Sequence, residues 1–442
     1  MALHKKFGMI SLGCDKNRVD GERILGVIRG HGCEITDDPS EAQVLVVNTC
    51  AFLGAARQEA IDTVLECSEY RAQKLEKLVV TGCLPEKFIG ELFGALTEAD
   101  VFLGIDDREY LFEALEKSYA GERVNYVGRS KEDVRGARVL TTSPHYAYLK
   151  ISDGCNNHCT YCLIPKIRGS YRSYPMDELV REAAGLGQLS ELILVAQDTT
   201  RYGEDLYGGK KLTDLLKKLS ELDNICHIRL LYCYPEAITE ELIAEIRDNP
   251  KIVHYLDIPM QHSEDRILKL MGRKGTRASY LSLLARLREA VPDLAVRTTF
   301  IAGFPTETEE EHRALMRFLE EAKLVNCGFF AYSREPDTPA YQLKGQINPS
   351  TKKRRVRELY EVQAKVSRAY LQGYVGTRTD VVCDGVDYEK GCFTGRAYFQ
   401  APEIDGTVYF HAAEAETGKT YRVFVERADD YDLYGHTTEE IG

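Results

Sequence analysis

Short β-rich runs separated by helix-length segments recur through the middle of the chain, and they constrain its fold more than any other feature. Six such runs lie at 146–151, 192–196, 228–233, 255–258, 296–301 and 328–332. Strands that alternate with helices favour a parallel sheet covered by those helices. We therefore predict a partial, TIM-like (βα)6 barrel, followed by a helix over 351–372.

The two flanks of this region have different patterns. The first 120 residues alternate four β-rich runs with amphipathic segments, which predicts a parallel α/β domain; the runs lie at 7–12, 44–48, 78–81 and 101–104. A polar stretch over 121–142 is predicted to be a linker. After residue 373, short alternating strands with glycines between them indicate a small β-barrel. The predicted fold class is α/β with this terminal barrel, and the predicted domains are 4–120, 141–371 and 374–442.

Cysteine content and charge narrow the range of functions and partners that this chain can have. The chain has 442 residues, 13 cysteines and a net charge of −12. No apolar run approaches the roughly 18 residues of a membrane helix, and the N-terminus lacks a signal-peptide pattern, so we expect a cytoplasmic protein with no membrane partner. Disulfides rarely persist there, so several cysteines are expected to bind metal. Residues 374–442 hold 6 Lys and Arg against 14 Asp and Glu, which favours a basic partner over nucleic acid.

The segment S-D-G-C-N-N-H-C-T-Y-C carries three cysteines just beyond the first predicted barrel strand. Cys155, Cys159 and Cys162 are spaced by four and three residues. Thiolates are the usual ligands of iron–sulfur clusters, and a cubane with four irons would keep one iron open for a substrate or cofactor. The alternative is a zinc site completed by His158 or a distant residue, but structural zinc prefers C-x-x-C pairs in matching halves, and no second half appears nearby. The spacing favours the cluster.

The prediction of a second site, formed by another trio of cysteines, depends on the predicted fold of the first domain. Cys14, Cys50 and Cys83 each follow a predicted parallel strand of the first domain. Parallel strands end on one edge of a sheet, where ligand sites lie, so we predict a second cluster there. The alternative is that these are buried small hydrophobic residues. The remaining cysteines show no such pattern and are assigned to packing; they are Cys33, Cys67, Cys226, Cys233, Cys327, Cys383 and Cys392.

Polar residues and turns follow several predicted barrel strands, where barrel enzymes place their sites. Arg297 lies within a strand and faces either a ligand carboxylate or a structural acid. Glu307 is expected to start the next helix, and Gly303 suits a turn that lets the backbone approach a ligand. His262 follows Gln261 at one strand end. The residues expected to bind a cofactor are Gln197, Asp198, Gln261, Arg297 and Gly303.

The motif C-N-N-H-C-T-Y-C resembles the radical S-adenosylmethionine (SAM) signature, with Tyr161 in the aromatic position before the last cysteine. Nearly the whole chain resembles the methylthiotransferase family in its domain order and its first cysteine trio. Within that family, S-L-G-C-D-K-N-R-V-D-G-E, V-A-Q-D-T-T-R-Y-G-E-D-L-Y-G and Y-L-D-I-P-M-Q-H are similar to the RimO branch. Asp15 stands where proline is more common in that branch, and Thr306 where glycine is usual.

The resemblance implies two [4Fe-4S] clusters. The one held by Cys155, Cys159 and Cys162 would bind and reductively cleave SAM, and Tyr161 would lie beside that cofactor. The cluster held by Cys14, Cys50 and Cys83 would carry the sulfur to be inserted, and a second SAM would give the methyl group. The acceptor implied is the β-carbon of an aspartate in ribosomal protein S-twelve, with flavodoxin or ferredoxin as electron donor. The terminal barrel resembles a TRAM domain.

Two other functions compete with this hypothesis. The same chemistry on tRNA adenosine would require salt-sensitive RNA binding by the terminal barrel. A non-catalytic zinc or iron–sulfur protein that binds ribosomes is the alternative from another class, and metal and sulfide analysis separates it from an enzyme. Two trios that are each one ligand short favour an exchangeable ligand, and therefore an enzyme.

Overall fold

The computed structural model describes residues 4–130, 135–437 and 439–441. The chain divides into two compact units, each of which is described by itself. The first unit contains the described residues up to Thr141 together with Asp153–Asn156 and Cys162–Tyr171. The second contains Thr142–Ser152, Asn157–Tyr161 and the chain from Arg172 onward. The loop that carries Cys155, Cys159 and Cys162 is therefore shared between the two units.

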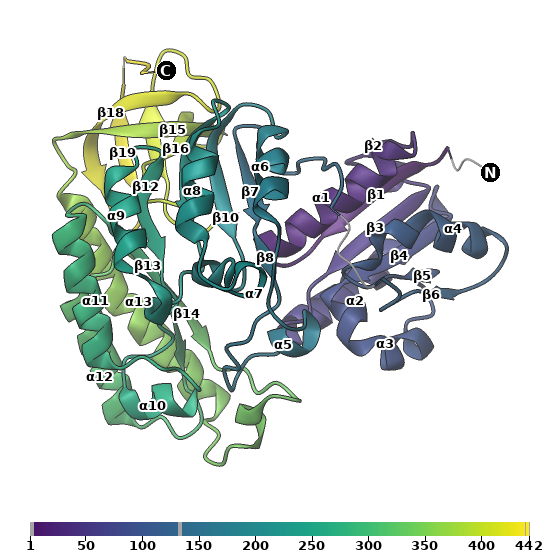
Figure 1. Ribbon diagram of the computed structural model, residues 1–442, viewed down its shortest axis with the longest axis horizontal. Helices are drawn as coiled ribbons and strands as arrows, with labels where there is room; N and C mark the ends of the chain where they lie inside the picture. Colours follow the sequence, from purple (N-terminus) through teal and green to yellow (C-terminus); the bar gives the residue numbers. More distant parts are fainter. Residues whose placement is uncertain (1–3, 131–134, 438, 442) are drawn as a thin grey trace. The chain divides into compact units, whose positions relative to one another are not determined.

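The first unit is built on a six-stranded parallel sheet with the order β2-β1-β3-β4-β5-β6 (Figure 1). Its strands are β1 (Lys6–Ser11), β2 (Glu34–Thr36), β3 (Val44–Thr49), β4 (Lys77–Gly82), β5 (Val101–Phe102) and β6 (Val124–Asn125). Its main helices are α1 (Asp15–Gly30), α2 (Gly54–Ser68), α3 (Cys83–Ala95) and α4 (Leu111–Tyr119). Every residue of β3 is buried, as expected of a central parallel strand covered on both faces.

The second unit contains an open six-stranded parallel sheet with the order β14-β13-β12-β11-β10-β7. Its strands are β7 (Tyr146–Lys150), β10 (Leu189–Val195), β11 (Ile225–Leu230), β12 (Ile252–Asp257), β13 (Ala295–Ala302) and β14 (Asn326–Ala331). The helices that alternate with them include α6 (Met176–Ala184), α8 (Leu212–Ser220), α9 (Glu240–Asp248), α11 (Arg277–Ala290) and α12 (Glu309–Ala322) (Figure 1). This is a half-barrel.

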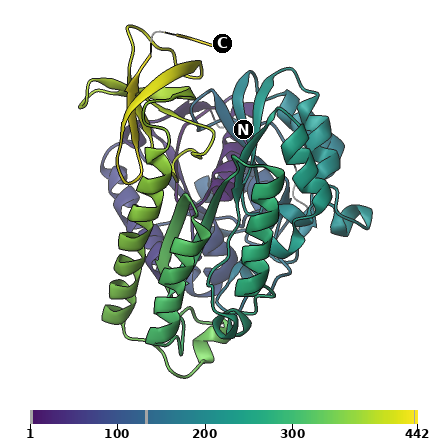
Figure 2. The same cartoon turned by 90° about the vertical axis from the view of Figure 1, so that its left-hand side faces the viewer.

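A 24-residue helix, α13 (Pro349–Gln372), leads from the half-barrel to a closed five-stranded barrel (Figure 2). Asn348 caps this helix by accepting a hydrogen bond from the backbone N–H of Thr351. The strands of the barrel are β15 (Arg378–Asp387), β16 (Cys392–Arg396), β17 (Val408–His411), β18 (Thr420–Ala428) and β19 (Leu433–His436).

The terminal barrel packs against the amino ends of the half-barrel strands. Asn326, the first residue of β14, donates to the carbonyl of Phe399 at 2.9 Å. The hydroxyl of Tyr255 in β12 donates to the carboxylate of Asp405 at 2.7 Å. The carboxyl edge of the sheet lies at the other end of these strands, where the polar residues of the candidate site are found.

The predicted fold class is confirmed, and all six β-rich runs of the central region form strands. Three of these strands, β10, β11 and β12, begin three residues earlier than predicted. The linker prediction over 121–142 is wrong at β6, and residues 131–134 of that stretch lie outside the described residues. Within the described ranges, none of the helices is long and apolar enough to cross a membrane.

Candidate functional site

Three cysteines of the first unit lie at one edge of its sheet. Cys14 caps helix α1 directly beyond β1, Cys50 follows β3, and Cys83 is the first residue of α3 after β4. Because β1, β3 and β4 are neighbours in the sheet, their carboxyl ends bring the three thiols together. Burial raises the pKa of both Cys50 and Cys83, and the charge of Cys14 adds to each shift, so the three thiols lie within electrostatic reach of one another.

Glycines permit this close approach. Gly13, immediately before Cys14, has a φ of +103°, and a Cβ there would lie 2.9 Å from the Cβ of Cys50. Gly82, immediately before Cys83, has a φ of +93°, and a Cβ there would lie 2.6 Å from the backbone oxygen of Thr49. A larger residue at either position would clash with the chain that carries Cys50, and it would also be strained by the left-handed backbone.

The chemistry of this trio fits a cluster better than a single ion. Burial raises the pKa of Cys50, and it raises the pKa of Cys83 to about 12 even though Arg168 opposes the shift. The free thiols of Cys50 and Cys83 are therefore neutral, and a bound metal would be needed to hold these two as thiolates. No three His, Cys, Asp or Glu side chains in the described part of the chain are close enough to hold one metal ion. A cubane is larger and takes ligands that stand farther apart.

The trio opens toward solvent at Cys14. Cys83 is buried, Cys50 is partly exposed and Cys14 is exposed. A hollow of about 280 Å³ lies beside Cys14, with Ser11 and Arg18 among its lining residues. A group bound by the three cysteines would therefore be reached from this side.

The second trio lies in the loop after β7, and its middle part is fixed to the carboxyl edge of the half-barrel. The side-chain amide of Asn157 donates to Asp198 at 2.8 Å, and the backbone N–H of Thr160 donates to the carbonyl of Met271 at 2.9 Å. The sulfur of Cys159 lies 3.5 Å from the hydroxyl of Tyr234, which follows β11.

The two ends of this loop belong to the first unit. The backbone N–H of Cys155 donates to the carbonyl of Gly169 at 3.1 Å. After Cys162, the side chains of Leu163 and Ile167 pack into the same hydrophobic core as Cys83. Ile167 is the last residue of short helix α5 (Ile164–Ile167), and Leu163 directly precedes that helix. The segment beyond the last cysteine is thus fixed by apolar contacts as well as by backbone hydrogen bonds.

Four of the residues expected to bind a cofactor lie in this loop or at the carboxyl edge. Tyr161 packs against a small core that includes Met271 and Phe304. Gln197 and Asp198 follow β10, and burial raises the pKa of Asp198. Gln261 follows β12 with a φ of +71°, and its backbone bonds to Thr299 and Ile301 of β13. Their cofactor-binding roles remain predictions.

The other two expected site residues, Arg297 and Gly303, have close partners within the protein, and their cofactor-binding roles remain predictions. Arg297 lies near the amino end of β13, where its guanidinium pairs with Asp257 at 3.0 Å and with Asp405 at 3.4 Å. A Cβ on Gly303 would lie 2.5 Å from the Cγ of Lys352, so the side chain of Lys352 packs closely against this glycine. Arg297 is thus paired with acidic side chains, and Gly303 is packed against a neighbouring side chain.

The predictions for Glu307 and Cys226 were wrong. Helix α12 begins at Glu309 with Thr308 as its cap, whereas Glu307 is buried and accepts hydrogen bonds from the backbone N–H groups of Gly303 and Phe304. Cys226 is exposed on β11 rather than packed in a core. The position after Glu307 takes the cap because a threonine hydroxyl can satisfy the free N–H groups of the first turn.

Two buried arginines beside the cysteines were missed. Arg168 donates to the sulfur of Cys83 at 3.6 Å, and Arg273 points an N–H at the sulfur of Cys159 at 4.0 Å. The guanidinium of Arg273 also stacks on the ring of Tyr234 at 4.2 Å. Neither arginine follows a periodic pattern, and only the fold brings it to its cysteine.

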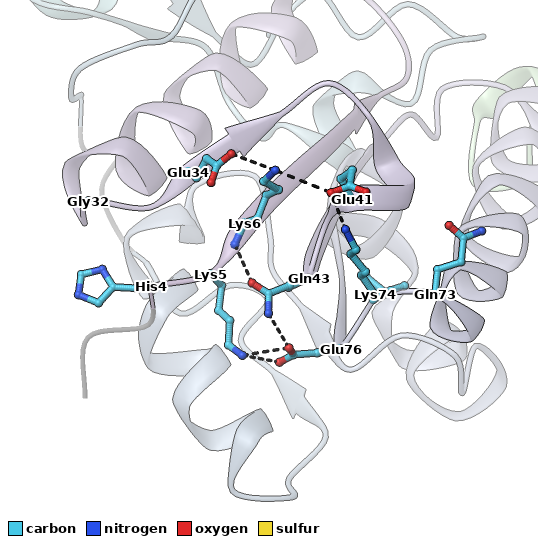
Figure 3. Close-up of a pocket in the computed structure, with 11 residues that line it drawn as sticks. His4, Lys5, Lys6, Gly32, Glu34, Glu41, Gln43, Gln73, Lys74 and Glu76 are labelled. Atoms are coloured by element: carbon cyan, nitrogen blue, oxygen red, sulfur yellow. Dashed lines mark hydrogen bonds and ion pairs between the residues drawn. The ribbon is translucent and has the colours of Figure 1, made fainter.

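A larger hollow of about 810 Å³ lies at the opposite, amino edge of the first unit's sheet (Figure 3). Its charged side chains satisfy one another: Lys5 pairs with Glu76 at 2.7 Å, and Lys74 with Glu41 at 2.6 Å. Gln43 bridges to Glu76 at 2.8 Å. The hollow lacks cysteines and is far along the strands from the trio, so it is not the candidate site.

Comparison with known protein families divides the chain into three matched regions. Residues 6–104 match the Uncharacterized protein family UPF0004. Residues 149–319 match the Radical SAM superfamily. Residues 375–437 match the TRAM domain. The first match contains Cys14, Cys50 and Cys83, and the second contains the loop with the other trio.

Solved structures share the fold at low sequence identity. TsrM from Kitasatospora setae, a radical S-adenosylmethionine methyltransferase solved with cobalamin and a [4Fe-4S] cluster, superposes with a TM-score of 0.55 at 14% identity. The match covers 76% of this chain and 77% of that one. A second structure of TsrM, with tryptophan and a SAM analogue, gives 0.56 at 13% identity, and it covers 87% and 79% of the two chains.

Curated relatives are much closer in sequence. The ribosomal protein uS12 methylthiotransferase RimO of Lachnoclostridium phytofermentans is 46% identical over 440 residues, which cover 97% of this chain and 99% of the relative. The protein of the same name from Clostridium botulinum is 45% identical, with 98% of each chain covered. With relatives this similar over nearly their entire length, the chain belongs to the RimO family of methylthiotransferases.

Proposed function

We propose that this chain adds a methylthio group to the β-carbon of an aspartate in ribosomal protein uS12, using two [4Fe-4S] clusters and SAM. The observation that carries the proposal is the convergence of Cys14, Cys50 and Cys83 at one sheet edge, in a chain that also has the radical SAM cysteine loop. The names of its relatives support the substrate. The terminal barrel's excess of eight acidic over basic residues suits a basic protein.

Each trio has a distinct task in this proposal. When bound, the cluster at Cys155, Cys159 and Cys162 supplies the electron that cleaves SAM, and the cluster at the other trio supplies the sulfur. Asn157 and Thr160 hold the cysteine loop on the carboxyl edge through Asp198 and Met271. Gln197, Asp198 and Gln261 lie at strand ends on that edge, where they would orient the cofactor. Tyr161 would pack beside it.

The proposal extends to domains and partners. The domains are 4–120 for the auxiliary cluster, 141–371 for SAM and 374–442 for the protein substrate. The three matched regions lie inside these ranges, which supports the division. A one-electron donor such as flavodoxin or ferredoxin would reduce the clusters in the cytoplasm, where ribosomes are found.

Mass spectrometry after anaerobic incubation tests the substrate. Reconstituted protein would receive SAM, a reductant and either uS12 or bulk tRNA. We expect a methylthio gain on an aspartate of uS12 and none on tRNA. A gain on tRNA alone would overturn the proposed substrate and keep the reaction class.

Cysteine variants test the division of labour. Cys155→Ala is expected to abolish SAM cleavage. The triple variant Cys14→Ala, Cys50→Ala, Cys83→Ala is expected to cleave SAM and transfer no methylthio group, with iron content reduced by about half because one of two four-iron clusters is lost. Cys226→Ala is the matched control, because this exposed cysteine belongs to neither trio. SAM cleavage that survives in Cys155→Ala would contradict the proposal.

A further inference from the structure

Arg168 is buried in the first unit between two carboxylates and a cysteine. Its side chain is 1% exposed. The Nη1 group donates to Asp20 of α1 at 3.0 Å and to Asp153 of strand β8 (Ser152–Asp153) at 2.9 Å. The Nη2 group donates to the sulfur of Cys83 at 3.6 Å. A single side chain thus contacts both acids and one ligand of the proposed auxiliary cluster.

The two carboxylates fix the direction of the sulfur contact. A guanidinium is a rigid planar fork, so holding one of its nitrogens determines where the other points. Asp20 and Asp153 both contact Nη1, and both are at most 4% exposed. The Nη2 group is therefore aimed at Cys83. Such an arrangement resembles the outer partners that orient ligands around metal sites.

Arg168 also belongs to the segment that follows the radical SAM cysteines. It lies six residues after Cys162, and its backbone N–H donates to the carbonyl of Ile164 at 2.8 Å, closing helix α5. Ile167, its neighbour in the chain, packs in the hydrophobic core that contains Cys83. The backbone at Arg168 is therefore held independently of its guanidinium.

We propose that Arg168 is a positioning residue that fixes the sulfur of Cys83 and ties the segment after Cys162 to the auxiliary cluster site. The inference rests on the proposed function, because it requires a cluster at Cys14, Cys50 and Cys83. Hydrogen bonds to cluster sulfurs raise the reduction potential of the cluster. Loss of an outer partner typically weakens metal binding about 10-fold to 100-fold.

The test uses the full chain carrying Cys155→Ala, Cys159→Ala and Cys162→Ala, so that iron binds only at the other trio. In this background, Arg168→Gln is expected to shift the midpoint potential, followed by electron paramagnetic resonance, to more negative values. Iron release to a chelator is expected to be about 10-fold faster or more. Arg123→Lys is the control, because Arg123 donates to the backbone carbonyls of Phe93, Leu96 and Ala99 away from the cysteines; it should change neither readout.

A purely structural role for Arg168 would lower stability without moving the potential. Unchanged midpoint potential and iron release in Arg168→Gln would therefore overturn the inference. If that variant does not fold, Arg168→Lys decides, because lysine keeps the charge beside both acids and lacks the second nitrogen aimed at sulfur; a parental potential in Arg168→Lys would overturn it. A background protein that binds no iron would reject the proposed function as well, whereas a loaded background with unaffected variants rejects only the role of Arg168.

Discussion

The guanidinium of Arg396 in strand β16 donates to the carboxylate of Glu191 in strand β10 at 2.6 Å, and both side chains are almost completely buried. Arg229 of β11 contacts the same carboxylate. Glu191 is the third residue of β10, so this network joins the terminal barrel to the amino edge of the half-barrel. The terminal barrel is therefore attached through buried charges as well as by helix α13.

Replacing Glu191 with glutamine is expected to destabilise the protein by about 3–5 kcal/mol, because two buried guanidinium groups lose their shared counter-charge. Denaturant unfolding of the metal-free protein measures the change. The control is Asp177→Asn, which removes one partner of an exposed pair with Lys218 and should have a much smaller effect because solvent screens the pair. Equal effects of the two variants would contradict the role assigned to the network.

The contribution of Glu191 should also depend on pH. Burial favours the neutral acid, but the charges of Arg229 and Arg396 and their hydrogen bonds outweigh it, and they lower the pKa of Glu191 from 4.5 to about 2. A carboxylate with a lowered pKa stabilises the folded state fully above its ordinary pKa. The stability advantage of the parent over Glu191→Gln should therefore be constant above about pH 5 and shrink as the pH falls from 4.5 toward 2. An advantage that grows on acidification would exclude this explanation.

Gly154 is expected to be essential for the radical SAM cysteine loop. Its φ is +75°, and a Cβ there would lie 2.1 Å from the backbone oxygen of Ser170, next to the hydrogen bond between Cys155 and Gly169. Gly154→Ala should displace Cys155, so that iron bound at its trio and SAM cleavage both fall sharply. Gly187→Ala is the matched control, because Gly187 has a φ of +80° and open space where a Cβ would go. Normal iron loading in Gly154→Ala would show that the loop tolerates the shift.

The fold could be read from the sequence wherever a strand was long and apolar. The runs at 146–151 and 44–48 gave clear signals because parallel strands buried on both faces are almost wholly hydrophobic. Strands β2 and β6 are three and two residues long, too short to show any periodicity. Their pairing is decided by the neighbouring strands instead.

The sequence alone predicts the cysteines of the candidate site, but it predicts few of the side chains that surround them. A local signal was available: glycine directly precedes Cys14, Cys83 and Cys155, and each of these glycines has a positive φ. No local signal marks Arg168, which lies 85 residues from Cys83 in the chain. For Arg297 the sequence leaves a ligand carboxylate and a structural acid equally open, and only the fold shows that Asp257 and Asp405 contact its guanidinium.

Arg273 is a buried charge that lacks an acidic partner at close range. It is 6% exposed, its Nη2 group donates to the carbonyl of Pro259 at 2.7 Å, and its Nη1 group points at Cys159. In the described part of the chain, its close contacts are a carbonyl, a sulfur and the aromatic ring of Tyr234 rather than a carboxylate. Burying an uncompensated charge costs several kcal/mol. The metal-free protein bears this cost, whereas an anionic cluster or its thiolates would balance the charge of Arg273.

Arg273→Met is therefore expected to separate stability from cluster binding. The unfolding free energy of the metal-free protein should change by less than about 1 kcal/mol, because removal of the buried charge offsets the lost contacts with Pro259 and Tyr234. Iron retention at Cys155, Cys159 and Cys162 in the presence of a chelator should fall about tenfold or more. The control is Arg288→Met, in which a helix-capping arginine that donates to the carbonyl of Ala322 is removed; it should lose stability and keep its iron. The reverse outcome, a destabilised Arg273→Met that retains its cluster, would mean that the arginine serves the fold and not the cysteine beside it.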